Sequence, residues 1–229
     1  MKSRLLGAVC AFVITQISIS VDAALVAKLD GLVVYDSDRN ITWMADANYA
    51  VTTSYDSDGL VNFAGAQGFI RALNSGTVDN LGFNNWRLPT TVQPDPSCDI
   101  QTNYLGTQFG SGTNCTGGEL GHLFYDELGG TPSESITNSL DPDVILFSNI
   151  QDGVYWSSTE WDRKDTVVNL IWVFDFEFGS QHAQDRNLIQ SFVWAVHDGD
   201  VGAVPIPPAL WLFGSGLIGL VGVARRKAA

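Results

Sequence analysis

Carboxylates are the most numerous residues in this chain that could carry chemistry. The sequence holds 25 Asp and Glu but only three His and three Cys. It shows no HExxH zinc motif, glycine-rich phosphate loop, Cys-rich metal motif or Ser-His-Asp order in a supporting context. A glycosidase needs two carboxylates at a defined separation, and the sequence singles out no such pair. We therefore predict no catalytic residues and a binding function.

Cys98 and Cys115 are the two cysteines that follow Cys10, and they enclose a polar loop rich in Gly and Asn. In an exported protein such a pair is expected to form a disulfide. A bridge over a loop of this size stabilises by roughly 3 kcal/mol in the chain-entropy model. The alternative is a catalytic thiol or a copper-binding pair, but nothing around these residues indicates a lowered thiol pKa.

Three loop residues are our candidates for ligand binding. Asp141 and Asp143 lie in a long acidic loop over residues 131–152, and Trp161 precedes the charged run 162–165. Long loops on a rigid scaffold often carry function. Carboxylates suit calcium, and an exposed Trp can stack on a sugar ring. We expect a neutral or calcium-bridged glycan to bind at one rim made by these segments and the Cys98–Cys115 loop; calcium is the possible cofactor, and whether a metal is needed stays open.

Two further groups could bind metal, and we interpret both differently. Asp36, Asp38 and Asn40 imitate the first half of an EF-hand loop, but Ile41 and Ala47 stand where that loop needs Gly and Glu. We expect a solvated turn there. His122 lies on a predicted helix, where a single His is more often a surface or hydrogen-bonded residue than a metal ligand.

The charge of the chain limits its partners. The formal net charge of the 229 residues is −13, and residues 24–204 carry seven Lys and Arg against 24 Asp and Glu, a difference of −17. Binding of nucleic acid or anionic lipid surfaces relies on Lys and Arg, so both are poor partners for a domain of this charge. Neutral glycans, cations or basic partners remain.

The N-terminus has the pattern of an export signal. Lys2 and Arg4 precede an apolar run, and small residues near Ala23 fit a cleavage site. We predict a signal peptide over residues 1–23, followed by one domain over 24–203, a size usual for a single domain.

The C-terminus has the pattern of a sorting signal over residues 204–229. A Pro-containing motif with Val204, Pro205 and Pro207 precedes a short Gly-rich apolar segment, which ends in a basic cluster of Arg225, Arg226 and Lys227. The apolar segment is near the lower limit for a transmembrane helix, and its basic cluster should stay cytoplasmic. This order resembles the PEP-CTERM class of sorting signals in a Val-Pro-Ile-Pro variant. The resemblance implies an exosortase-like partner and a transient membrane anchor; a plain tail anchor is the alternative.

Periodicity predicts antiparallel strands with two helices. Residues 32–36 and 41–44 form a predicted hairpin, and Asn62 is the expected N-cap of a helix ending near Gly76. A second helix should begin at a Thr116–Glu119 capping box. Strands are predicted over 86–88, 154–158, 170–178 and 192–196, the third with one buried face, and 179–187 is interpreted as a connection.

Several motifs resemble the Lcl C-terminal domain family of bacterial surface adhesins. They are Trp86-Arg87-Leu88-Pro89-Thr90, Tyr155–Glu160, Phe192–Asp200 and the two segments of the first hairpin, so the resemblance spans roughly residues 30–201. It implies an α+β, C-type-lectin-like fold related to formylglycine-generating enzymes, with glycan binding in the adhesin member. His197 stands where we expect Arg in this family. Trp86, Trp156, Trp172 and Trp194 lie in strand-like motifs and are predicted to be core.

Together these features predict an exported cell-surface or extracellular-matrix module that binds carbohydrate and takes part in adhesion. A purely structural matrix protein and a glycan-active hydrolase are the alternatives.

Overall fold

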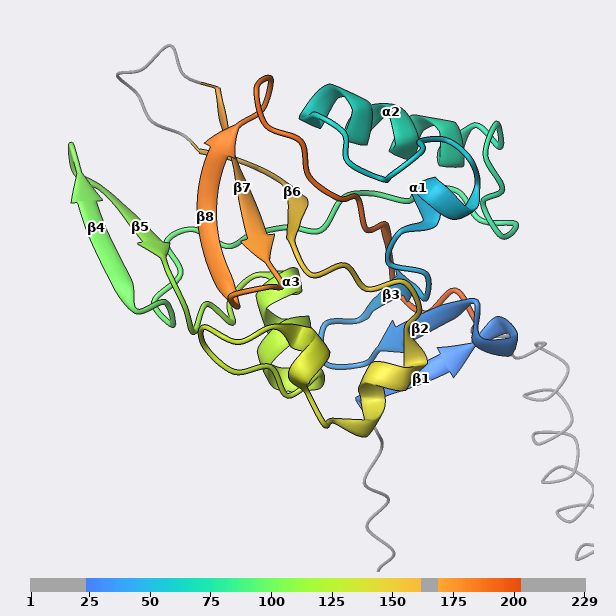
Figure 1. Cartoon of the computed structure of the whole chain (residues 1–229), viewed down its shortest axis with the longest axis horizontal. Helices are drawn as coiled ribbons and strands as arrows, with labels where there is room; N and C mark the ends of the chain where they lie inside the picture. Colours follow the sequence, from blue (N-terminus) through green and yellow to red (C-terminus); the bar gives the residue numbers. More distant parts are fainter. Residues whose placement is uncertain (1–23, 162–168, 203–229) are drawn as a thin grey trace, which may run out of the picture.

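The computed structural model describes residues 24–161 and 169–202 and shows an α+β architecture with antiparallel sheets (Figure 1). The described strands are β1 (Leu25–Lys28), β2 (Val33–Asp36), β3 (Ile41–Met44), β4 (Ile100–Tyr104), β5 (Thr107–Ser111), β6 (Val154–Glu160), β7 (Leu170–Asp175), β8 (Ser180–Asp185) and β9 (Val196–Asp198). The described α-helices are α1 (Tyr49–Thr52), α2 (Phe63–Asn74) and α3 (Glu119–His122). The strands form sheets in the orders β1-β2-β3-β9, β4-β5 and β6-β7-β8.

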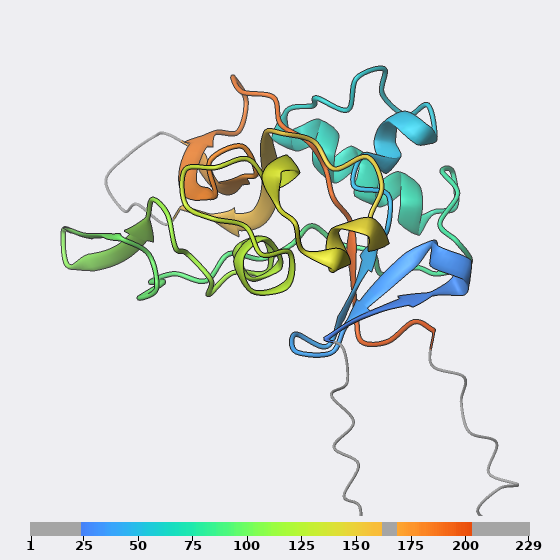
Figure 2. The same ribbon diagram turned by 60° about the horizontal axis from the view of Figure 1, so that its bottom comes forward.

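The four-stranded sheet joins the two ends of the described domain. The predicted hairpin is confirmed as β2 and β3, while β1 was not predicted. β9 pairs with β3, which brings residues 196–198 beside the first hairpin. Lys28 Nζ lies 3.1 Å from Asp200 Oδ2, so the first and last described elements are adjacent, on one side of the domain (Figure 2).

Helix α2 matches its prediction closely. The Asn62 side chain accepts a hydrogen bond from the Gly65 N–H, as an N-cap should, and Phe63, Ala66, Phe69 and Leu73 are buried. Gly76 has a positive φ of 72° just after the helix, where glycine costs least.

The second helix differs from its prediction in two ways. Its N-cap is Gly118 and not Thr116, because the Glu119 carboxylate, which a capping box would turn back to its own helix, binds Arg87. After His122 the backbone continues as a π-helix over Leu123–Glu127, with Leu128 N–H donating to Leu123 C=O at 2.9 Å.

The three-stranded sheet corrects two predictions for the C-terminal half. Residues 180–185 are not part of a connection but form strand β8, which pairs along its length with β7. Strand β7 is buried on both faces, since Ile171, Trp172, Val173, Phe174 and Asp175 are all buried, whereas the alternation predicted one buried face. Its apparent alternation of polar and apolar residues arises from Asp175, which is also buried.

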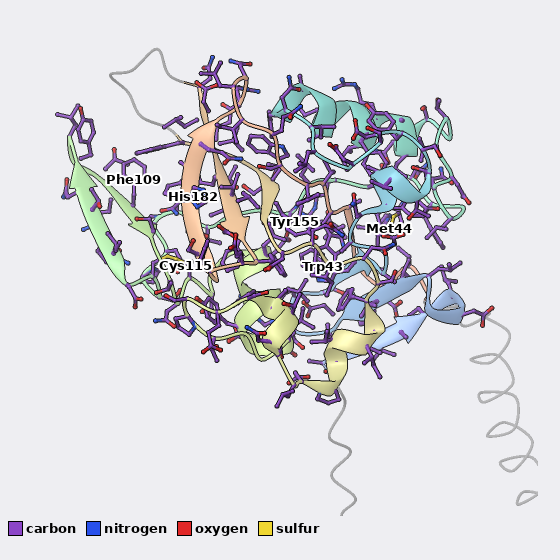
Figure 3. The ribbon with its side chains drawn as sticks, in the orientation of Figure 1. Trp43, Met44, Phe109, Cys115, Tyr155 and His182 are labelled. Atoms are coloured by element: carbon purple, nitrogen blue, oxygen red, sulfur yellow. A yellow bond between two sulfur atoms is a disulfide. The ribbon has the colours of Figure 1, made fainter. Side chains whose placement is uncertain are left out.

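Aromatic side chains fill the core, as predicted for the motif tryptophans. Trp86, Trp156, Trp172 and Trp194 are all buried. Figure 3 shows Trp43 and Tyr155 in the middle of the domain, with Phe109 and Cys115 toward the end that carries β4 and β5. The predicted strand at 86–88 is reduced to one bridge between Arg87 and Val196. Fixed side-chain hydrogen bonds hold this segment instead, including Trp86 Nε1 to the Asn80 carbonyl at 3.2 Å.

The predicted signal peptide (1–23) and sorting signal (204–229, with Val204, Pro205, Pro207, Arg225, Arg226 and Lys227) lie outside the described residues. Within the described ranges no helix is long and apolar enough to span a membrane.

Candidate functional site: an aromatic-floored cleft

The Cys98–Cys115 loop forms a structured arm. The predicted disulfide is present, and the loop between its cysteines folds into the hairpin β4–β5, which extends from the domain (Figure 1). Its tip is the two-residue turn Leu105-Gly106, with φ of 48° and 83°. The hairpin is joined to the rest of the domain at Gly112, the residue after β5, which bridges to Gln181 of β8.

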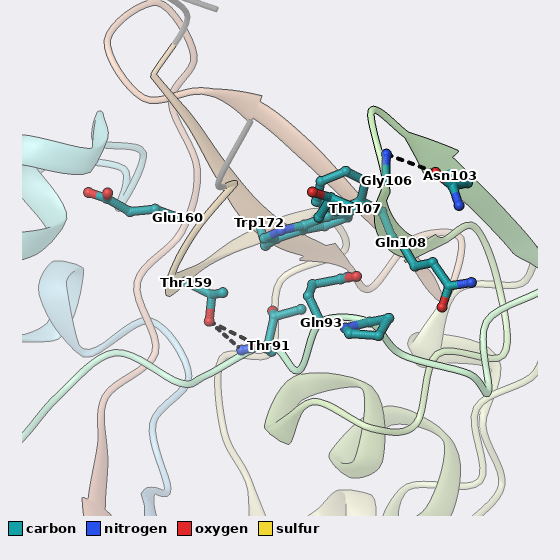
Figure 4. A pocket seen from close by; sticks show the side chains of 11 residues that line it. Thr91, Gln93, Asn103, Gly106, Thr107, Gln108, Thr159, Glu160 and Trp172 are labelled. Carbon is teal, nitrogen blue, oxygen red and sulfur yellow. Dashed lines mark hydrogen bonds between the residues drawn. The ribbon is translucent and has the colours of Figure 1, made fainter. Parts of the chain in front are cut away.

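A cleft of about 640 Å³ lies between this hairpin and the β6–β7 pair. It is lined by Thr91, Gln93, Pro94, Asn103, Gly106, Thr107, Gln108, Phe109, Thr159, Glu160 and Trp172. Figure 4 shows Trp172 between Thr159 on one side and Thr107 and Gln108 on the other. The volume is within the range of ordinary small-molecule sites.

The aromatic rings of Phe109 and Trp172 make the floor of the cleft, and Trp161, which is outside the lining, packs against both. Phe109 lies 5.4 Å from Trp161 and 6.2 Å from Trp172, and the two Trp rings are 5.7 Å apart, measured between ring centroids. Trp161 was predicted to be the Trp with the best chance of exposure. It is half-buried, because its ring packs against Phe109 and Trp172. Trp172 is 2% exposed, so it borders the cleft mainly as an apolar surface.

Hydroxyl and amide groups make the walls. The Gln93 side chain is fixed to Gly110, accepting from its N–H and donating to its carbonyl, each at 2.8 Å. Thr159 and Thr91 are joined by two hydrogen bonds of 2.9 Å (Figure 4). Asn103 accepts from Gly106 N–H at 3.2 Å, and Gln108 is an exposed side chain of the hairpin. These bonds hold the walls in place before any ligand arrives.

The cleft carries little charge for so acidic a domain. Glu160 is the single carboxylate among the described residues that line it, and it pairs with Arg186 at 3.1 Å. A neutral polyhydroxylated ligand fits such a surface, because hydroxyl groups can bond to amides while the apolar ring face rests on aromatic side chains.

Asp141 and Asp143 lie elsewhere. They belong to a 3₁₀-helix over Pro142–Leu146, in which Asp141 is the N-cap and accepts from Asp143 N–H at 2.9 Å. This helix, near β1 in Figure 1, is well separated from the β4–β5 hairpin. Burial, and then the nearby charge of Asp141, raise the pKa of Asp143. The structure therefore places Trp161 and the disulfide loop together but does not add the acidic loop to the same rim.

The motif residues from the sequence hold the frame of the cleft. Arg87 donates two hydrogen bonds to Glu119, at 2.8 and 2.7 Å, and two more to Asp198, at 2.9 and 2.6 Å. Burial alone would lower the pKa of Arg87, but these bonds raise it above its ordinary value. Ser158 N–H donates to the Pro89 carbonyl at 2.7 Å, which ties the same segment to β6. Chain segments far apart in sequence thereby bring Thr91 and Thr159 to the cleft.

Sequence reasoning missed most of the cleft because its hairpin has an unusual turn. A two-residue turn with two left-handed residues usually has the sequence Asn-Gly or Asp-Gly, which makes it recognisable. Here Leu105 occupies the first left-handed position. The polar alternation of residues 100–104 was therefore interpreted as loop. The sequence shows that Phe109 and Trp172 are apolar. Only the tertiary structure shows that both line the same cleft.

A family model described as the Lcl C-terminal domain matches residues 32–197. No curated protein and no solved structure matches the chain.

Proposed function

This chain belongs to the Lcl C-terminal domain family, and on that premise we propose that it is an exported surface module that binds a neutral glycan in the cleft between β4–β5 and β6–β7. Family membership indicates a surface-associated domain. The C-type-lectin-like fold implied by the motifs is part of the proposal, and the antiparallel α+β architecture is consistent with it.

The observation that carries the proposal is the composition of the cleft. Its floor is aromatic, its walls are amide and hydroxyl groups already held by hydrogen bonds, and its one described carboxylate is paired with Arg186. A prearranged wall lowers the entropy cost of binding, since few side chains must be ordered by the ligand. A hydrolase acting through two carboxylates is the less favoured alternative, because Glu160 has no described carboxylate partner in the lining.

The position of the cleft suits a tethered module. The β4–β5 hairpin lies away from β1, the first described strand, in Figure 1, and the last described residues lie beside β1 because Lys28 pairs with Asp200. If export and sorting proceed through the two terminal signals, an anchor beyond residue 202 leaves the cleft facing away from the membrane. The proposed partners are therefore an extracellular polysaccharide and an exosortase-like sorting enzyme.

The test is binding of the chain to a panel of neutral and sulfated polysaccharides, measured by calorimetry with calcium and with chelator. We expect neutral glycans to bind and sulfated ones to bind less. Gln108→Ala should weaken binding roughly 5- to 10-fold by removing one hydrogen bond. Trp161→Ala should weaken it further by disturbing the aromatic floor.

Gln190→Ala is the matched control, because Gln190 is also an exposed glutamine but lies outside the cleft lining. Asp141→Asn and Asp143→Asn test the acidic loop separately. Wild-type affinity in both cleft variants would move the site away from the cleft. Loss of binding in the acidic-loop variants or with chelator would assign it to a calcium site there. A chain that binds no neutral glycan would favour the structural matrix role.

A further inference from the structure

A buried cluster of Asp36, His122 and Glu127 shares no residue with the cleft lining described above. Asp36 ends β2, and the β2–β3 turn is held against the start of α3 because Arg39 donates to the Thr116 carbonyl at 2.6 Å and the Gly117 carbonyl at 3.3 Å. The three side chains are 0%, 6% and 5% exposed. One donor atom from each lies within 4.8 Å of the other two.

Some buried polar atoms of the cluster have no regular hydrogen bond to the described residues of the protein. Asp36 Oδ1 accepts from Arg39 N–H at 2.9 Å, and the Trp43 indole also stabilises the Asp36 carboxylate, which partly offsets the rise in its pKa on burial. Asp36 Oδ2 and His122 Nε2 are buried and have no hydrogen bond of regular geometry among the described residues. His122 Nε2 lies 3.0 Å from Glu127 Oε1 and 3.7 Å from Asp36 Oδ2. Burial raises the pKa of both carboxyl groups, which marks the cost of holding two acids in this place. Two buried ligand atoms without a regular hydrogen bond face one another here, so the space between them can take a further partner.

The π-helix explains why two acids flank one histidine. In an α-helix the side chain at i+5 is turned roughly 140° away from position i, whereas a π turn brings it beneath i. Asp126 at i+4 and Glu127 at i+5 therefore both reach His122, through Nδ1 at 2.9 Å and Nε2 at 3.0 Å. Single π turns inside helices are frequent at functional sites.

We infer that Asp36, Glu127 and His122 Nε2 form a binding site for one divalent transition-metal ion of the Zn²⁺ type. Tetrahedral zinc with bonds of about 2.0–2.2 Å separates its ligands by about 3.3 Å, and the two measured separations from His122 Nε2 bracket that value. Two carboxylates neutralise the charge of the ion. The imidazole nitrogen favours Zn²⁺ over Ca²⁺, which prefers oxygen ligands.

Asp126 completes the arrangement as a positioning residue. Its Oδ2 lies 2.9 Å from His122 Nδ1, the nitrogen that faces away from the proposed ion. A carboxylate in this place accepts the ring N–H and so leaves Nε2 with its lone pair for the metal. The second cluster with metal-ligand spacing, Asp95 with Cys98 and Cys115, does not compete, because its sulfurs are joined in the disulfide.

The test uses the full chain with Cys10→Ser, which removes the one thiol outside the disulfide. After stripping with chelator, the chain should bind one Zn²⁺ by calorimetry, and Co²⁺ should give visible absorption bands of a low-coordinate site. Asp126→Asn should weaken Zn²⁺ binding about 10- to 100-fold. Glu127→Gln and Asp36→Asn, which keep the side-chain shape, should weaken it more.

His182→Gln is the control, because His182 is a partly buried histidine on β8 outside the cluster; it should bind Zn²⁺ as the parent does. If a variant does not fold, the Co²⁺ spectrum and the Zn²⁺-induced rise in melting temperature of the parent still decide the question. The inference is overturned if the parent binds no stoichiometric metal, or if Glu127→Gln and Asp36→Asn bind like the parent. His122 then only packs between the carboxylates of Asp36, Asp126 and Glu127.

Discussion

Arg87 is the residue on which the frame of the cleft depends most. Its guanidinium contacts both carboxylate oxygens of Glu119 and also Asp198, the last residue of β9. Glu119 in turn accepts from Thr90 N–H at 2.7 Å, so one carboxylate fixes the side chain and backbone of the same segment. This geometry needs the planar fork of arginine.

We predict that Arg87→Ala lowers the free energy of unfolding by about 2–4 kcal/mol. The reason is that Glu119, with a side chain 13% exposed, would keep a buried charge without its partner, although the 28% exposure of Arg87 moderates the loss. The free energy of unfolding of Arg87→Lys should lie between those of the parent and Arg87→Ala, because lysine keeps the charge but cannot bind a carboxylate through two parallel hydrogen bonds. Denaturant unfolding measures both.

Arg71→Ala is the control for this prediction, since Arg71 is exposed on α2 and should change stability by less than about 0.5 kcal/mol. Equal stability of Arg87→Ala and Arg71→Ala would show that the network contributes nothing to folding.

His197 shows how the departure from the expected family arginine is accommodated. Its ring lies edge-on to Trp86 at 5.7 Å and to Phe83 at 6.4 Å, and its Nδ1 lies 2.6 Å from the Asp198 carbonyl. At this position the side chain serves packing against the motif tryptophan.

The β4–β5 hairpin is the element whose local sequence fits its conformation least. Leu105 has a φ of 48° and is 72% exposed. A left-handed conformation costs a side chain like leucine roughly 1–2 kcal/mol, and asparagine tolerates it better. The turn type strongly favours Asn-Gly over Leu-Gly.

We predict that Leu105→Asn stabilises the domain by about 1 kcal/mol, a rise in melting temperature of about 2–4 °C for a domain of this size. Thermal unfolding followed by circular dichroism measures it. Leu188→Asn is the matched control, because Leu188 is also exposed but has no positive φ. A melting temperature unchanged or lowered by Leu105→Asn contradicts this account of the turn.

The disulfide closes the base of the same hairpin, over a separation of 17 residues. Replacing both cysteines by serine should lower the free energy of unfolding by about 3 kcal/mol, because the unfolded chain gains the freedom of the opened loop. Chemical unfolding of the double variant against the parent measures the loss. Mass spectrometry of unreduced exported protein checks the premise, which two free thiols would contradict.

At the scale of the whole molecule, the two ends of the described domain lie on one side, away from the β4–β5 hairpin that borders the cleft (Figures 1 and 2). Lys28 and Asp200 join these ends by an ion pair. One tether at residue 203 and beyond would thus hold the domain without covering its cleft.

We predict that the mature surface form lacks residues 1–23 and the tail from about Val204. The short apolar segment and its basic cluster Arg225, Arg226 and Lys227 have the order of a processed sorting signal. Intact-mass measurement of extracellular protein should give a chain without either end. Full-length tails recovered only from the membrane would instead support a permanent anchor.

Sequence periodicity and end signals determined the elements that depend on local physics. The first hairpin follows from two β-type runs around a turn, and α2 follows from its Asn62 cap and its apolar face. The disulfide followed from a count of cysteines. The burial of the motif tryptophans followed because large aromatic side chains in strand-like segments have few alternatives to the core.

The tertiary structure alone decided which residues share a site. Thr91, Gln108 and Trp172 meet at one cleft because the Arg87 network and the disulfide place three distant segments side by side. A local sequence pattern carries no information on how close such segments lie in space. From the sequence, Asp36 is expected in a solvated turn, and His122 is expected to be a surface or hydrogen-bonded residue of a helix. They became partners in a buried cluster because the turn after β2 packs on α3 and a π turn redirects Glu127. Burial and register are properties of packed elements, so the chemistry that depends on them appears only when the chain is folded.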